Sequence, residues 1–130
     1  MSWPRVVLVL TSIGFLGFGI AYTMWPLPMA RLTDIPLPTP TARIDFAATY
    51  GGVQIGFGLF LFVCSRRLGW IEPGLWAATA VLLGLLLARF QSIAVLGVSP
   101  ARPIWIGIAI EASGALACGL TLRYVRRLST

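Results

Sequence analysis

Residues 73–97 read PGLWAATAVLLGLLLARFQSIAVLG, and Arg89 is the only charged side chain among them. A helix needs about 20 mostly apolar residues to cross a bilayer, because lipid offers no hydrogen-bond partner to an open backbone. Pro73 suits the first turn of such a helix. The segment therefore predicts a transmembrane helix with a charged residue embedded in it.

Three further stretches have the same character, at residues 6–25, 42–64 and 103–124. We therefore expect one domain over residues 1–130, an all-α four-helix transmembrane bundle. The composition agrees, since 58% of the chain is hydrophobic and 11% is charged, whereas soluble domains carry about a quarter charged residues. The first stretch follows Arg5 as in a signal peptide, but it is long for one and lacks a good cleavage site. We interpret it as a retained helix.

Arginines at the ends of the predicted spans set the expected orientation. Six lie on one side of the membrane and three on the other, leaving one inside a span: Arg5, Arg66, Arg67, Arg123, Arg126 and Arg127 against Arg31, Arg43 and Arg102, with Arg89 embedded. Because basic residues favour the cytoplasmic side, both termini are expected in the cytoplasm of a bacterial inner membrane. The same scatter makes a nucleic-acid partner unexpected, because the arginines form no single patch.

Proline dominates the connection between the first two spans. Five prolines lie between residues 26 and 41, mixed with apolar residues: Pro26, Pro28, Pro36, Pro38 and Pro40. Repeated proline favours extended, polyproline-like backbone. We therefore expect a long Pro-rich outer loop on the membrane surface, and a stiff connector and a lid over a site both remain open interpretations.

The sequence offers no obvious catalytic or metal-binding set. Histidine is absent, and neither Cys64 nor Cys118 belongs to a paired CxxC motif. We therefore expect no metal, no cofactor and no catalytic residues, and interpret both cysteines as apolar core residues. Gly52 and Gly56 match a helix close-packing motif, for which packing within the chain is favoured over dimerisation.

Arg89 and Glu111 are the embedded charges that need an explanation. Each lies eleven residues from position 100, the middle of the turn between the last two spans. Equal distance from the turn of an antiparallel hairpin means equal depth, roughly 12 Å below the outer boundary at about 1.5 Å per residue. A lone charge at a helix centre costs about 2.5–3.5 kcal/mol on insertion scales. We therefore predict an ion pair between these two side chains.

Further polar residues are candidates for the same network. Arg43, Tyr50 and Gln54 follow helical spacing on one face of the second span, and Asp45 lies above Tyr50 within reach of the Arg89 stem. Ser92 shares the Arg89 face of the third span. Together these side chains predict a buried polar pocket in the outer half of the bundle. Two interpretations stay open: the network fixes helix register, or it binds a ligand, ion or proton.

The second span carries a family resemblance. Its opening RIDFAATYGG, residues 43–52, together with the embedded Ala88–Arg89 and Glu111, resembles an uncharacterised bacterial four-helix membrane family, a domain of unknown function with a DoxX-like layout. The resemblance covers nearly the full chain. It implies the fold and a membrane location, and it implies no specific chemistry for any residue.

Three classes of function compete at this stage. The first is a non-catalytic membrane protein, either an accessory subunit of a membrane protein partner or a binder of a quinone, isoprenoid or lipid. The second is an oligomeric transporter or channel for a small solute or proton, which would need several copies of so small a bundle. The third is an intramembrane isomerase, disfavoured because pairing Glu111 with Arg89 opposes the tuning that a catalytic carboxylate needs.

Overall fold

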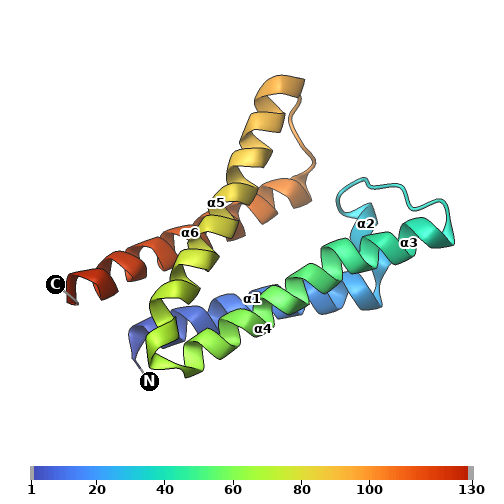
Figure 1. Cartoon of the computed structure of the whole chain (residues 1–130). Coiled ribbons are helices and arrows are strands. Elements are labelled where there is room, and N and C mark those ends of the chain that lie inside the picture. Colours follow the sequence, from blue (N-terminus) through green and yellow to red (C-terminus); the bar gives the residue numbers. More distant parts are fainter. Residues whose placement is uncertain (1, 129–130) are drawn as a thin grey trace.

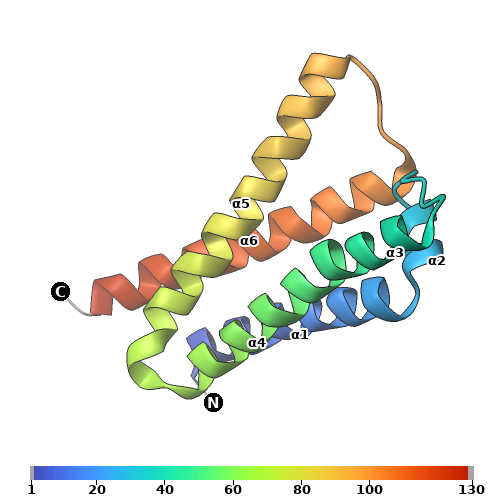
Figure 2. The same cartoon turned by 45° about the vertical axis from the view of Figure 1, so that its right-hand side comes forward.

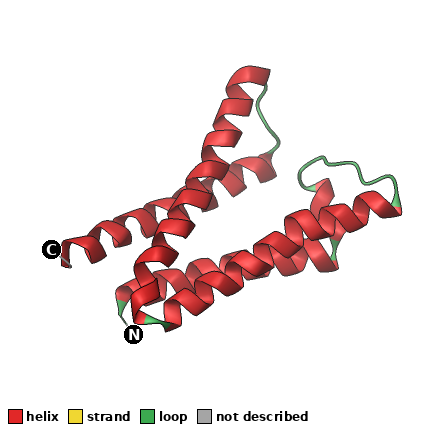
Figure 3. Ribbon diagram, viewed as in Figure 1, coloured by secondary structure: helices red, strands yellow, loops and turns green. Residues whose placement is uncertain are grey.

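The structure, a computed structural model, describes residues 2–128. Within that range it contains helices and loops and no strand (Figure 3). Four helical segments are long and apolar enough to cross a membrane: α1 (Trp3–Met24); the continuous run of α3 (Pro40–Phe46), η1 (Ala47–Gly52) and α4 (Val53–Arg66); α5 (Ile71–Leu96), preceded by the short η2 (Leu68–Trp70); and α6 (Arg102–Leu128). The predicted all-helical membrane fold is confirmed.

The four long helices form two antiparallel hairpins. Figures 1 and 2 show α1 beside the run α3–η1–α4, and both termini at the same end of the molecule. We refer to this as the terminal end. The helices α5 and α6 cross near that end and then separate, so that residues 97–101 bridge a wide gap between their far ends (Figure 2). The molecule is therefore closed at one end and forked at the other.

The shared hydrophobic core explains the closed end. One cluster of buried residues takes members from all four long helices: Val7, Leu8, Leu61, Cys64, Ile71, Leu75, Ala78, Cys118 and Leu122. A second, smaller cluster takes its buried members from α5 and α6, namely Leu82, Leu86, Ile108 and Ala115, and Phe15 of α1 packs against both clusters. The larger cluster, at the terminal end, is the one with buried members from both hairpins in residues 2–128. Cys64 and Cys118 are buried and free, as packing residues would be.

Glycines bring α1 and the second helix into close contact. A Cβ atom on Gly19 would lie 2.9 Å from the Gly51 carbonyl oxygen, and one on Gly58 would lie 3.0 Å from the Leu16 backbone nitrogen. Gly52 and Gly56, by contrast, have nothing within 4 Å of such an atom. The prediction that Gly52 and Gly56 pack within the chain is therefore wrong. Both are exposed, whereas Gly51 and Gly58 of the same helix are buried against α1.

A buried hydrogen bond reinforces the same helix pair. Ser12 Oγ donates to the Gly58 carbonyl oxygen at 2.7 Å, with Ser12 fully buried. Ser12→Ala is expected to lower the free energy of unfolding by about 1 kcal/mol, because the bond crosses between helices in an apolar setting. Denaturation in mixed detergent micelles would measure the loss. Ser113→Ala is the matched control, since its exposed hydroxyl bonds only Ile110 O of its own helix.

The prediction of a long Pro-rich loop over residues 26–41 is wrong at both ends of that range. Residues Pro26–Arg31 form a short helix, α2, and Pro40 opens α3, so the non-helical part is confined to residues 32–39. Proline is compatible with the first turn of a helix, where its missing N–H would have no partner. Thr39 completes the start of α3 by accepting a hydrogen bond from Ala42 N at 3.1 Å. These prolines begin helices instead of preventing them.

A turn of π-helix interrupts the second long helix. Residues Ala47–Gly52 bond in the wider i→i+5 pattern, between α3 and α4. The wider turn changes the rotation between the residues before it and those after it. Arg43 therefore does not share the face that regular helical spacing assigns to it with Tyr50 and Gln54.

Candidate functional site

The embedded charges form a two-pronged ion pair between α5 and α6. Arg89 Nε donates to Glu111 Oε2 at 3.0 Å, and Arg89 Nη2 donates to Glu111 Oε1 at 2.9 Å. This parallel geometry is the strong form of the arginine–carboxylate interaction. The side chain of Arg89 is 33% exposed and that of Glu111 is 13% exposed. The predicted pair is therefore present, and its guanidinium is the more accessible partner.

Aromatic rings of α1 and the second helix form a cluster around Tyr22. The Tyr50 and Phe46 rings stack with centroids 4.7 Å apart, and Tyr22 of α1 meets Phe46 edge-on at 5.6 Å. Tyr22 is within electrostatic range of Arg89 and Glu111. The cluster therefore approaches the pair through Tyr22, while Phe46 and Tyr50 contact Tyr22 and each other. Sequence reasoning missed Tyr22, which shares no motif with the others and is placed by the α1–η1 contact.

An apolar cleft opens beside Arg89, where α5 and α6 separate. It is an open cleft with a volume of about 440 Å³. The lining comes from the last turns of α5, the connecting loop and the start of α6: Leu85, Ala88, Arg89, Ser92, Ile93, Leu96, Val98, Pro100 and Ile104. Arg89 is the single charged residue of that lining, and Ser92 adds a hydroxyl. The cleft can therefore offer hydrogen bonds at one point and apolar contact elsewhere.

Several of the polar residues predicted for this site do not bond to the Arg89–Glu111 pair. Arg43 and Asp45 are exposed on α3, and Gln54 is half-buried on α4. Over residues 2–128 their side chains make no hydrogen bond and no ion pair, so Arg89 meets Glu111 and not Asp45. The Tyr50 ring contacts Tyr22 and Phe46, and Ser92 lines the cleft beside Arg89. The ligand-binding role of these residues stays a prediction.

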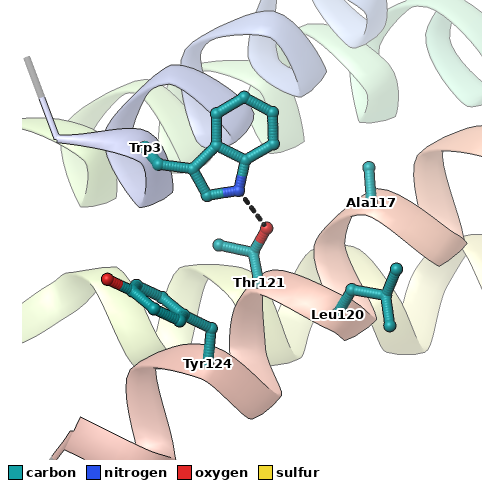
Figure 4. Close-up of a pocket in the computed structure, with 5 residues that line it drawn as sticks. All are labelled: Trp3, Ala117, Leu120, Thr121 and Tyr124. Carbon is teal, nitrogen blue, oxygen red and sulfur yellow. Dashed lines mark hydrogen bonds between the residues drawn. The ribbon is translucent and has the colours of Figure 1, made fainter.

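A second hollow lies at the terminal end, between the start of α1 and the end of α6. It measures about 480 Å³ and is lined by Trp3, Ala117, Leu120, Thr121 and Tyr124. Figure 4 shows the Trp3 indole reaching across to α6, where its Nε1 donates to Thr121 Oγ1 at 3.2 Å. Trp3 and Thr121 satisfy one another, and no charged side chain lines the hollow. It resembles a packing groove between two membrane helices more than a ligand site.

The fold and the pair together define a multi-pass membrane protein with an ion pair embedded between its last two helices. The chain belongs to the family described as a domain of unknown function, DUF4345, whose model matches residues 4–122. The predicted membership of an uncharacterised membrane family is thereby confirmed. No curated protein and no solved structure was found to be similar.

Proposed function

We propose that this protein is a non-catalytic membrane protein that binds an apolar small molecule, such as a quinone, isoprenoid or lipid, in the cleft between α5 and α6. The observation that carries the proposal is the position of the ion pair. Arg89 is tied to Glu111 and still one-third exposed, and it lines an otherwise apolar cleft of about 440 Å³. Ionisable groups at membrane depth are costly, and they mark functional sites more often than other residues do.

Several finer assignments belong to the same proposal. A bacterial inner-membrane location with cytoplasmic termini is supported by arginines that flank aromatic rings near the α4–α5 turn and the end of α6. Arg66 lies over Phe62, Arg67 over Trp70 and Arg126 over Trp76, as suits a cytoplasmic interface.

The four-helix layout supports a relation to DoxX-like proteins. The open face at Gly52 and Gly56 supports contact with a membrane protein partner or a second copy.

Filling the cleft should expel its ligand. Ala88 is exposed and lines the cleft, so Ala88→Trp places a large ring in the ligand's space without disturbing the core. We expect native mass spectrometry of gently purified protein to show a bound molecule in the wild type and about tenfold less of it in the variant. Ala80→Trp is the matched control, because Ala80 is an exposed α5 residue outside the cleft lining. Wild-type protein without a bound molecule, or equal loss in both variants, would contradict the proposal.

A further inference from the structure

We infer that the cleft selects a neutral headgroup that accepts hydrogen bonds through carbonyl oxygens, the chemistry of a quinone, over an anionic headgroup such as a phosphate. This inference rests on the proposed function, because it names the class of ligand for the same cleft. Three features carry it: the charge of the Arg89–Glu111 pair, the hydrogen-bond donors that the pair leaves free, and the apolar character of the remaining walls.

The charge balance at the cleft disfavours an anion. Arg89 donates two N–H groups to Glu111, at 3.0 and 2.9 Å. The positive guanidinium and the negative carboxylate together carry no net charge. An anionic headgroup beside Arg89 would also meet the negative charge of Glu111 directly behind it. No other charged residue of the described chain lines the cleft to offset that repulsion. An ion brought to this depth would in addition lose its hydration without a partner of its own.

The free groups at the cleft are hydrogen-bond donors. A guanidinium carries five N–H groups, so three remain after the two bonds to Glu111. Ser92 lines the cleft, and its hydroxyl forms no bond to any residue between 2 and 128. Tyr22 and Tyr50 do not line the cleft, so Arg89 and Ser92 are the residues that supply its donors. A headgroup with several acceptor oxygens can accept hydrogen bonds from these donors. An alcohol would add another donor to a cleft that already has donors without acceptors.

The apolar walls of the cleft indicate that the rest of the ligand is apolar. Apart from Arg89 and Ser92, the lining side chains are aliphatic, and several are exposed toward the membrane, including Leu85 at 39% and Leu96 at 69%. We therefore expect the ring beside Arg89 and an apolar tail against Leu96 and Ile104, which line the same cleft. The ligand class that meets all three conditions is a carbonyl-bearing ring with a hydrocarbon tail.

Two soluble probes with the same tail separate the alternatives. Isothermal titration of the full chain in detergent would compare a decyl-substituted benzoquinone with decyl phosphate. We expect the quinone to bind at least about tenfold more tightly. Arg89→Lys keeps a positive charge for Glu111 but removes the planar fork with its spare donors, so it should weaken quinone binding about tenfold. The matched control Arg123→Lys, an exposed residue outside the cleft, should bind like the wild type.

A second variant covers the case in which Arg89→Lys folds poorly. Ser92 is exposed, so Ser92→Ala should fold normally and weaken quinone binding severalfold. Tighter binding of decyl phosphate, or quinone binding that neither cleft variant changes, would overturn the inference. The proposed function would still stand after such a result if a molecule co-purifies with the wild type and is lost in Ala88→Trp. Absence of any co-purifying molecule would remove the proposed function itself.

Discussion

Arg89→Leu is expected to lower the free energy of unfolding by about 2–3 kcal/mol. The reason is that Glu111, only 13% exposed, would keep a charge at membrane depth without its guanidinium partner. Glu111→Gln should cost less, because Arg89 is more exposed and its flexible stem can carry an unpaired charge toward water. Denaturation of purified protein in mixed detergent micelles measures both losses.

The double variant distinguishes the pair from its two members. With Arg89→Leu and Glu111→Gln combined, no unpaired charge remains, so the double variant should recover much of the stability that Arg89→Leu alone loses. Losses that simply add would show that the two side chains act separately, against the geometry of their two short hydrogen bonds. Singles that fold as well as the wild type would show that the pair contributes nothing to stability and serves only a ligand.

Gly51→Ala is expected to cost about 1–3 kcal/mol of the free energy of unfolding, because the added methyl group overpacks the contact between α1 and η1. A Cβ atom there would collide with Thr23 Oγ1 and would lie 3.0 Å from both the Gly19 carbonyl oxygen and the Thr23 backbone nitrogen. The Thr23 hydroxyl cannot easily turn away, since it donates to Gly19 O at 2.9 Å. Thermal unfolding in detergent, followed by circular dichroism, would report the loss.

The neighbouring glycine provides the control. Gly52→Ala places the same methyl group where nothing lies within 4 Å, so its stability should match the wild type or gain up to about 1 kcal/mol from helix propensity. Adding Thr23→Ala to Gly51→Ala should restore only part of the loss, because the two backbone contacts remain. Equal effects of Gly51→Ala and Gly52→Ala would contradict the close approach of α1 and η1.

The sequence was sufficient for the features that depend on spacing along one helix or across one turn. Long apolar runs predict the four spans, since hydrocarbon excludes every other backbone arrangement of that length. The Arg89–Glu111 pair follows from equal distances to a single turn, because the geometry of one hairpin fixes relative depth. Neither inference needs knowledge of how the two hairpins meet.

The features that sequence reasoning missed depend on contacts between segments. The run of prolines predicts a loop over residues 26–41, but Pro26 and Pro40 each begin a short helix, where a missing N–H costs nothing. The π-helical turn at Ala47–Gly52 has no repeating signature, and it changes the face on which Arg43 lies. Tyr22 reaches the site only because glycines let α1 approach the second helix closely. The separation of α5 from α6 likewise has no local cause in either helix.

That separation determines how a ligand would reach this protein. The cleft lies between two membrane-crossing helices and is bordered by exposed aliphatic side chains. The ligand proposed above would enter this cleft laterally from the neighbouring lipid without passing through water. Its occupancy would then follow its mole fraction among the surrounding lipids.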